Sequence, residues 1–221
     1  MYSLILKDIL IQKKMMGFTL AYCIFILIAF NSPVFASMTY VMGAMASSYL
    51  FIQGACAYES KGNSEIVLNS FPLRRSEIVG ARYLSVFVFM FLSLVIIGFF
   101  GAVMKGIGLP FPQRYIGWID VLGVAVTLLL MSSLYLPLYF KFGYIQARFF
   151  NVILFLLIFF TPSLVKQYYE ENREKEIFQT LLLFLEKSPP WLIGCLITTV
   201  LLLLVYLSYL FSVRIYQHRE F

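Results

Sequence analysis

The sequence predicts an all-α, polytopic membrane protein with six transmembrane helices, and three observations lead to this prediction. Residues of the set AVILMFWYC make up 61% of the 221 residues, whereas charged residues make up 13%. A globular domain is roughly half apolar and a quarter charged, so this chain has too few charges for a surface that faces water throughout. The mean hydropathy is +0.86, and it is concentrated in long charge-free runs.

Six charge-free runs are long enough to cross a bilayer, because a helix needs about 20 apolar residues to span a hydrocarbon core of about 30 Å. The first run is the shortest, and the others can span with some tilt. The predicted spans are Met15–Phe30, Val34–Ala57, Tyr83–Met104, Val121–Phe140, Phe149–Val165 and Trp191–Val213.

The residues before the first span, 1–14, are expected to form an amphipathic helix at the membrane surface. Leu6, Ile9 and Leu10 recur at helical spacing, and lysines flank them. A cleavable signal peptide is the alternative, because a lysine-bearing start, an apolar run and the small-residue pattern Val34-Phe35-Ala36 imitate one. The long charged start and the immediate second span favour a retained first helix.

The distribution of Lys and Arg predicts the orientation of the spans. With six spans both termini lie on one side, and that side holds eleven of the 17 basic residues. The other side holds six basic and six acidic residues, so the net charge of +6 falls on one face. Loops rich in Lys and Arg stay in the cytoplasm. We therefore predict a multi-pass protein of the cell (cytoplasmic) membrane with both termini in the cytoplasm.

The sequence lacks residues and motifs that several classes of function require. None of the six spans contains Asp, Glu, Lys, Arg or His, which argues against a proton relay or an intramembrane enzyme. Cys23, Cys56 and Cys195 lack the spacing of a metal site, so no metal is expected. Basic residues form short islands, which argues against nucleic-acid binding. No G-x-x-x-x-G-K-[ST] motif occurs, so energy for any uphill transport must come from another subunit.

The longest connection on the predicted cytoplasmic side, residues 58–82, has the pattern of a helix, a turn and a second helix. Gly62-Asn63 is expected to break the incoming helix, and Phe71-Pro72 to form an extended turn, because the residue before proline avoids the α region. Ser76 is the expected N-cap of a helix that continues into the third span, with Glu77 in its first turn. The connection would then be a compact cytoplasmic knob.

Arg74 and Arg75 would lie at the tip of this knob; the alternative is a plain basic loop. The run LNSFPLRRSEIV over residues 68–79 resembles the LxSLPxSRxEIVxxKY signature of small ABC-2 type permeases, the membrane subunits of bacterial ABC exporters. Phe71, Arg74 and Arg82 depart from the Leu, the small residue and the Lys of that signature. The resemblance is closest to exporters of peptides, such as phenol-soluble modulins or antimicrobial peptides.

The resemblance implies one transmembrane domain over residues 1–221, with an interfacial helix (1–14), a cytoplasmic coupling region (58–82) and an extracellular amphipathic segment (166–190). It implies two copies of a cytoplasmic ABC ATPase, which would bind ATP and Mg, and a second permease subunit in a homodimer or heterodimer. The chain itself would bind no cofactor and would not be an enzyme. The residues that would couple to the ATPase are Glu59, Glu65, Phe71, Pro72, Arg74, Arg75 and Glu77.

Spans two and five line the interface between permease subunits in this family, so the resemblance makes residues of these spans candidates for a dimer interface or pathway. The candidates are Gly43, Ser47, Gly54, Phe155 and Phe159. Span two is rich in small residues, which allow close helix approach; ordinary packing inside one subunit is the alternative. Span five is almost entirely Phe, Leu and Ile over 149–160, which suits a hydrophobic or amphipathic cargo.

The segment 166–190 follows Pro162, which is expected to end the fifth span, and it carries apolar residues at helical spacing. It would form an extracellular gate, or merely cover the bundle. The expected function is export of a hydrophobic or amphipathic cargo, with a peptide or toxin first and a drug or lipid second. The alternatives are a membrane scaffold or sensor that transports nothing, and an intramembrane enzyme.

Overall fold

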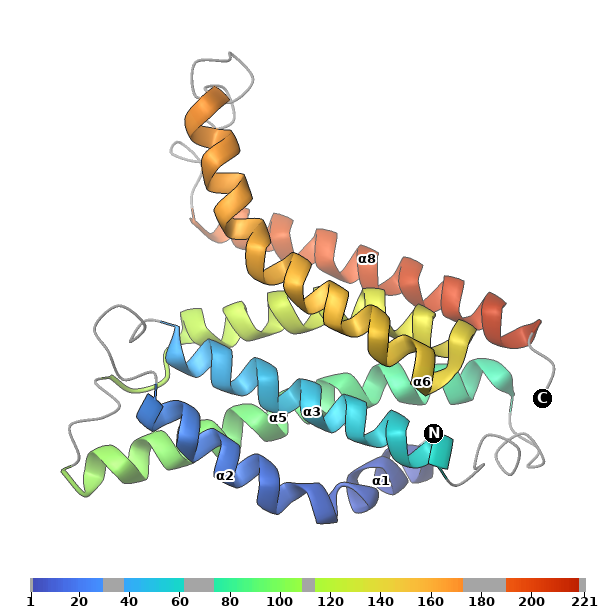
Figure 1. Cartoon of the computed structure of the whole chain (residues 1–221), viewed down its shortest axis with the longest axis horizontal. Helices are drawn as coiled ribbons and strands as arrows, with labels where there is room; N and C mark the ends of the chain where they lie inside the picture. Colours follow the sequence, from blue (N-terminus) through green and yellow to red (C-terminus); the bar gives the residue numbers. More distant parts are fainter. Residues whose placement is uncertain (1, 30–37, 62–73, 109–113, 173–189, 219–221) are drawn as a thin grey trace.

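The computed structural model describes residues 2–29, 38–61, 74–108, 114–172 and 190–218, and between 155 and 172 it describes the backbone only. The described helices are α1 (Tyr2–Ile11), α2 (Lys13–Ala29), α3 (Thr39–Lys61), α5 (Arg75–Gly106), α6 (Trp118–Asn172) and α8 (Pro190–Gln217) (Figure 1). No strand occurs in this part of the chain, so its all-α class is confirmed.

Three described segments are long and apolar enough to cross a membrane: Arg75–Gly106, Trp118–Leu154 and Gly194–Gln217. The bent pair of α1 and α2 makes a fourth if it counts as one span. α3 is 23 residues long, but it is not among these segments, because its glycines, its serines and Gln53 lower its mean hydropathy. Membrane-spanning helices are therefore confirmed, while the total of six remains a prediction.

The chain begins with two helices that meet at 66°. The amide N–H groups of Met15 and Met16 both donate to the carbonyl of Gln12, which lies at the bend. α1 corresponds to the predicted interfacial helix, whose position at a membrane surface remains a prediction. Leu6 and Leu10 of α1 are exposed, whereas Leu4 and Asp8 are buried against the bundle.

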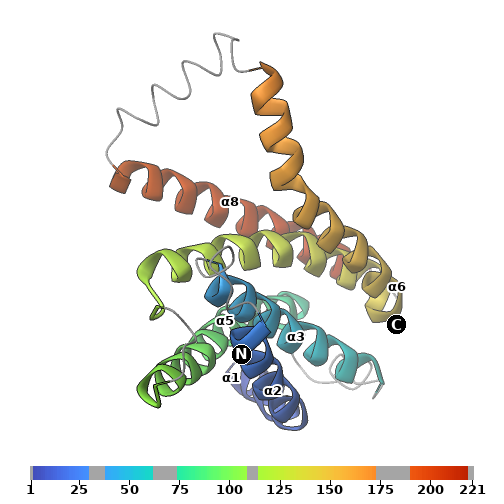
Figure 2. The same ribbon diagram turned by 60° about the vertical axis from the view of Figure 1, so that its left-hand side comes forward.

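α6 contains both the fourth and the fifth predicted spans, with no loop between them. Gly143 has φ 76° and ψ 175° inside the helix, a conformation that L side chains rarely adopt, and the two arms of α6 meet at this bend (Figures 1 and 2). The helix also continues through Pro162 to Asn172, so Pro162 does not end it as expected. Membrane helices tolerate an internal proline where neighbours satisfy the freed backbone group.

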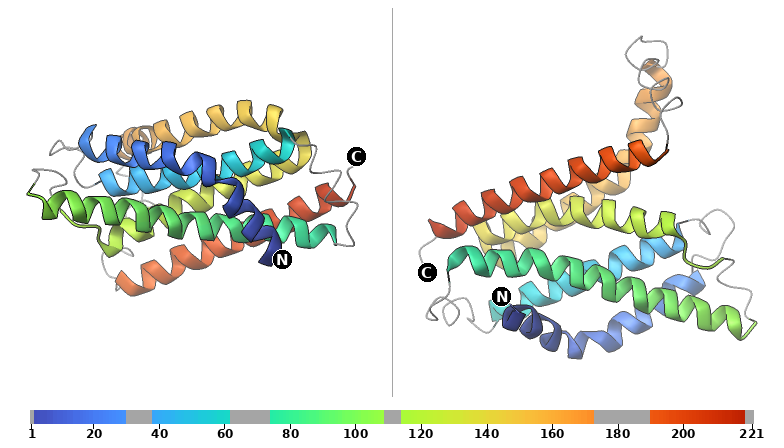
Figure 3. Two further views of the ribbon diagram at one scale, coloured as in Figure 1. Left: turned by 90° about the horizontal axis from the view of Figure 1, so that it is seen from below. Right: turned by 180° about the vertical axis from the view of Figure 1, so that it is seen from behind.

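Both termini lie at one end of the bundle (Figures 1 and 3), as predicted. We call this end the termini end; it holds the start of α1, the end of α3, the start of α5, the bend of α6 and the end of α8. We call the other end, which holds the start of α3, the end of α5 and the start of α6, the opposite end. The structure contains no membrane, so the side on which each end lies remains a prediction.

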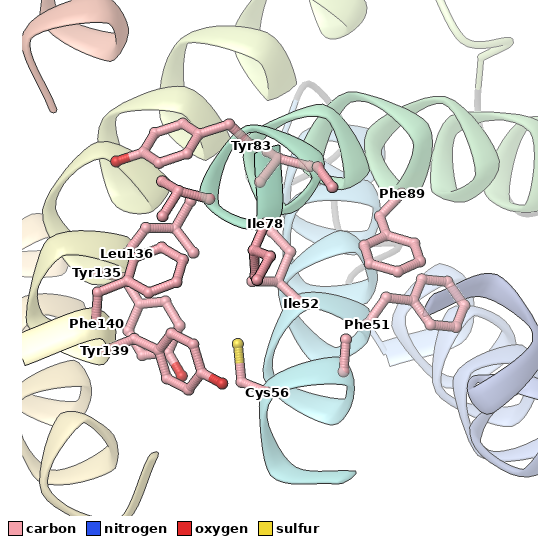
Figure 4. Packing of buried hydrophobic residues seen from close by; sticks show 14 of the residues in the cluster. Phe51, Ile52, Cys56, Ile78, Tyr83, Phe89, Tyr135, Leu136, Tyr139 and Phe140 are labelled. Atoms are coloured by element: carbon pink, nitrogen blue, oxygen red, sulfur yellow. The ribbon is translucent and has the colours of Figure 1, made fainter. Parts of the chain in front are cut away.

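The main apolar core lies where α3, α5 and α6 pack together, and α8 covers α5 and α6. Figure 4 shows side chains of all three helices converging, with Cys56 of α3 among Ile78 of α5 and Tyr139 of α6. The rings of Phe51 and Phe89 lie 5.7 Å apart and join α3 to α5. Close packing of this kind holds the four helices at set positions.

Candidate functional site

A group of charged side chains is buried at the termini end, where α1, α3, α5 and α6 meet. Arg82 of α5 is 5% exposed and lies between two carboxylates. Its Nη1 donates to Oδ2 of Asp8 at 2.9 Å, and its Nη2 donates to Oε2 of Glu59. Arg82 therefore joins α5 to α1 and to α3 by ion pairs that are shielded from solvent.

Three further side chains complete this group. Lys7 Nζ lies 3.1 Å from Glu59 Oε1, and the Tyr139 hydroxyl donates to Glu59 Oε2 at 3.0 Å. Ser85 Oγ donates to Asp8 Oδ2 at 3.0 Å. Two cations balance two anions, and both carboxylates accept hydrogen bonds, as buried charges require. We call these residues the ion cluster: Lys7, Asp8, Glu59, Arg82, Ser85 and Tyr139.

Local spacing explains how each helix contributes to the ion cluster. Arg82 and Ser85 are three residues apart on α5 and so share one face of the helix. Leu4 and Asp8 are likewise one turn apart and both buried, so α1 turns this face to the bundle. Glu59 lies in the last turn of α3, two residues beyond the predicted second span.

Burial by itself raises the pKa of Glu59, but the Arg82 guanidinium and the Lys7 ammonium outweigh it and lower that pKa to about 2. Glu59 is therefore ionised at physiological pH. Because its folded pKa is depressed, its contribution to stability is present above the ordinary value of 4.5 and is lost as pH falls through about 2.

A cavity of about 20 Å³ adjoins the ion cluster and is lined by its charged residues and by Leu4, Ile78, Ala81, Phe140 and Tyr216. Such a volume holds about one water molecule. The ion cluster is thus too enclosed to bind a transported solute. Its geometry instead connects four helices mechanically.

Of the residues expected to couple to an ATPase, Glu59 is buried in the ion cluster rather than exposed. Arg74 is exposed at the start of α5, and its backbone N–H donates to Glu77 Oε2 at 3.1 Å. Arg74, and not Ser76, is therefore the N-cap. The expectation was wrong because the carboxylate of Glu77 caps through the backbone, which any residue type supplies. Glu65, Phe71 and Pro72 lie outside the described residues.

Arg75 is held by the end of α8 instead of standing free at a tip. Its Nη1 donates to the carbonyl oxygens of Tyr216 at 3.2 Å and Gln217 at 2.8 Å. These carbonyls belong to the last turn of α8, where a cation also complements the helix dipole. Arg75 thus fastens α8 to the first turn of α5.

Three of the interface candidates, Gly43, Ser47 and Gly54, are closely packed against other helices of the same chain. Their expected role in a dimer interface or pathway remains a prediction. A side chain on Gly43 would collide with Ile97 of α5. Ser47 Oγ donates to the Gly43 carbonyl and lies 3.0 Å from the Cys23 sulfur of α2, and a Cβ on Gly54 would lie 2.9 Å from Gln12 Oε1.

The other two interface candidates, Phe155 and Phe159, lie on the second arm of α6, where only the backbone is described. Their expected role in an interface or pathway remains a prediction. Residues 173–189 of the expected extracellular segment also lie outside the described residues, and its beginning is part of α6.

A second ion pair lies at the opposite end. Arg114 contacts both carboxylate oxygens of Asp120, at 2.9 and 2.6 Å, and Asp120 accepts the backbone N–H of Gly117 at 2.7 Å. Tyr40 of α3 donates to the Arg114 carbonyl at 2.8 Å. This pair determines where α6 begins and fastens the preceding turn to α3.

Sequence reasoning missed Asp8 and Tyr139 as members of the site and treated Arg82 only as part of a signature. A signal was present, because Glu59 and Arg82 lie at predicted span ends and Asp8 lies in the predicted interfacial helix on the same side. Charges so close to the hydrocarbon region are expected to face protein and to pair. The pairing itself joins residues up to 74 positions apart, which no local pattern reveals.

The part of the chain that the structure describes contains no group of three or more His, Cys, Asp or Glu arranged to hold a metal ion. Cys23 and Cys56 are buried and Cys195 is exposed, and all three are free thiols.

Apolar helices of membrane length, with charges gathered at their ends, define an integral membrane protein of the helical class. The family model described as ABC-2 family transporter protein matches residues 3–217, so this chain belongs to the ABC-2 transporter family. Members of this family are membrane transport subunits, not catalytic ones, and they work with an ABC ATPase. No curated protein and no solved structure matches the chain.

Proposed function

We propose that this chain is the permease subunit of an ATP-driven exporter and that two copies of the ABC ATPase dock at its termini end. The ion cluster is the observation that supports this proposal. It lies at the base of the two helices, α3 and α5, that lead into and out of residues 62–73. This connection is where the proposed ATPase would contact the chain.

The ion cluster makes these helices move as one body. Separating Arg82 from Asp8 or Glu59 would leave an uncompensated buried charge, which costs about 3–5 kcal/mol. A push on the connection between α3 and α5 is therefore passed on to α1 and α6 as a rigid-body movement instead of being absorbed locally. Such a movement opens and closes a pathway formed with a second permease subunit, in a homodimer or heterodimer.

Arg74 is the basic residue best placed to touch the ATPase. It is exposed at the first residue before α5, whereas Arg75 is hydrogen-bonded to α8. An exposed arginine paired with an acidic partner contributes little binding energy but sets orientation and association rate. Arg74 thus takes the docking role that the sequence assigned to both arginines.

The proposed cargo is hydrophobic or amphipathic, with a peptide or toxin first and a drug or lipid second. The exposed faces of α6 and α8 are apolar, with residues such as Ile153, Leu203 and Phe211 at the surface. A polar solute would lose its hydration at such a surface without gaining hydrogen bonds. An amphipathic helix or a lipid would bury its apolar side there.

The test is co-reconstitution with the ABC ATPase in proteoliposomes, with ATP hydrolysis and movement of a labelled amphipathic peptide measured together. Arg74→Glu is expected to lower peptide movement per ATP at least about tenfold, because like charges would then meet at the docking surface. Lys105→Glu, at the opposite end, is the matched control and is expected to leave coupling unchanged.

An ATPase rate that does not respond to the permease would overturn the proposal in favour of a membrane scaffold or sensor. Equal effects of Arg74→Glu and Lys105→Glu would show that docking does not occur at the termini end.

A further inference from the structure

A groove between α6 and α8 carries an inference that goes beyond the proposed function. Its volume is about 770 Å³, within the range of about 300–1,000 Å³ that ligand sites occupy. Apolar side chains line it from both arms of α6 and from α8. We call it the α6–α8 groove; its lining residues are Ser133, Leu134, Pro137, Leu138, Leu154, Leu204, Leu207, Ser208, Leu210, Phe211 and Arg214.

The α6–α8 groove runs from the termini end toward the middle of the bundle. On α8 it extends from Arg214 back to Leu204, which is about 15 Å along a helix that rises 1.5 Å per residue. Leu154 lies on the second arm of α6, about 16 Å beyond the bend at Gly143. The groove therefore has the depth of one leaflet, half of a hydrocarbon core of about 30 Å.

Polar atoms at the floor of the groove form hydrogen bonds with other groups of the protein. Pro137 has no N–H to give to the carbonyl of Ser133, four residues before it. Ser208 Oγ donates to that carbonyl at 2.5 Å and lies 2.6 Å from the Tyr83 hydroxyl. The remaining surface is apolar and open, with Leu207 52% and Phe211 59% exposed. An acyl chain of a lipid would pack against this apolar surface.

The mouth of the groove is basic. Arg214 lines it and is exposed in the last turn of α8, and within the described part of the chain no carboxylate forms an ion pair with it. Lys141 is exposed just before the α6 bend, at the same end of the bundle. Basic pockets between membrane helices bind anionic lipid headgroups.

We propose that the α6–α8 groove holds one phospholipid with an anionic headgroup, its phosphate on Arg214 and one acyl chain along the leucines of α6 and α8. The charge at the mouth and the depth of one leaflet favour this occupant. A second copy of the chain packed here about an axis normal to the membrane would place the two Arg214 side chains at equal depth, where like charges repel.

The test is lipid retention by the full chain. The protein is purified in mild detergent, equilibrated with equal amounts of phosphatidylglycerol and phosphatidylcholine carrying the same acyl chains, and examined by native mass spectrometry. The wild type is expected to retain phosphatidylglycerol about fivefold more than phosphatidylcholine, the preference that one basic residue near an anionic headgroup provides. Arg214→Gln is expected to bring this ratio close to one.

Two further variants test separately how the lipid headgroup and the acyl chain contribute to retention. Leu207→Trp, which fills the groove, is expected to lower retention of both lipids at least about threefold. Arg148→Gln is the matched control, a basic residue at the same end that does not line the groove, and it is expected to change nothing. Far-UV circular dichroism and size-exclusion elution verify that each variant is folded.

Equal retention of the two lipids by the wild type would overturn the proposal, as would equal losses in Arg214→Gln and Arg148→Gln. Unchanged retention in Leu207→Trp would place the lipid outside the groove. A dimer crosslinked through cysteines at positions 207 and 211 would assign the groove to a second copy of the chain.

Discussion

The two ends of the bundle both contain a buried acidic residue paired with an arginine, yet they are built differently. At the termini end Arg82 pairs with Asp8, 74 residues away, and its side chain is 6% exposed. At the opposite end Arg114 pairs with Asp120, six residues away, and its side chain is 38% exposed. The first pairing determines how helices are assembled, whereas the second determines where a single helix begins.

The two ion pairs also differ in how much each contributes to stability. Removing one partner of a buried ion pair strongly destabilises the protein, because the other charge remains shielded from water without a counter-charge. An arginine that is more than a third exposed keeps much of its hydration, so its pair contributes little. Stability should therefore respond strongly to changes in the ion cluster and weakly to changes in the Arg114–Asp120 pair.

The largest effect is expected from Arg82→Met, which leaves Lys7 as the one cation of the ion cluster for the two buried carboxylates of Asp8 and Glu59. The free energy of unfolding should fall by about 3–5 kcal/mol, measured by denaturant titration in detergent with circular dichroism. The triple variant Asp8→Asn, Glu59→Gln, Arg82→Met should recover most of this loss, because the one charge left in the ion cluster is that of Lys7, whose side chain is 32% exposed and reaches water. A loss below about 1 kcal/mol in Arg82→Met would show that the ion cluster is solvated.

Tyr139→Phe should have the next largest effect. It removes one hydrogen bond to the ionised carboxylate of Glu59 and leaves the ion pairs in place, so a loss of about 1.5 kcal/mol is expected by the same titration. Tyr135→Phe is the matched control, since the Tyr135 hydroxyl is buried on the same helix and has no hydrogen-bond partner among the described residues. Equal losses in the two variants would contradict a specific role for Tyr139.

At the opposite end, Asp120→Ala should cost about 1 kcal/mol, because the start of α6 loses the acceptor for the Gly117 N–H. Asp120→Asn keeps an acceptor and loses only the ion pair with Arg114, so its cost should be smaller, about 0.5 kcal/mol. The same unfolding measurement ranks the two variants. If Asp120→Ala proves as costly as Arg82→Met, the proposed difference between the two ends is wrong.

The smallest effect is expected from Arg75→Gln, about 0.5 kcal/mol, because only the exposed last turn of α8 loses a cation at its carbonyl end. Hydrogen exchange should show faster amide exchange confined to residues 212–218. Arg74→Gln, one residue earlier and without these hydrogen bonds, should leave that exchange unchanged. Faster exchange throughout α5 would instead indicate that Arg75 supports the whole helix.

Four predicted spans lie wholly within described helices. Tyr83–Met104 lies within α5, Val121–Phe140 and Phe149–Val165 lie within α6, and Trp191–Val213 lies within α8. Helix formation in an apolar run is a local matter, because in lipid each backbone group must find its partner within the helix. For that reason residue composition alone locates these helices.

The positions where the structure differs from the sequence-based expectations have another property in common. The bend at Gly143, the continuation through Pro162 and the N-cap at Arg74 all lie where the local signal is weak or ambiguous. On α1 the burial of Asp8 was not predicted, and the apolar residues Leu6 and Leu10 are exposed. Apolar periodicity cannot predict this, because in a bilayer apolar residues are also stable on the outside.

By itself the sequence determined that this chain is a helical membrane protein, that its charges lie outside the apolar spans, and that it resembles an ABC-2 permease. Those features depend on composition and short motifs, which local hydrogen bonding and lipid solvation convert directly into helices. Only the tertiary structure decided which charges meet, because Asp8, Glu59 and Arg82 come from three helices and are brought together by packing. Pairing across such distances depends on how the helices are arranged, and no local pattern encodes that arrangement.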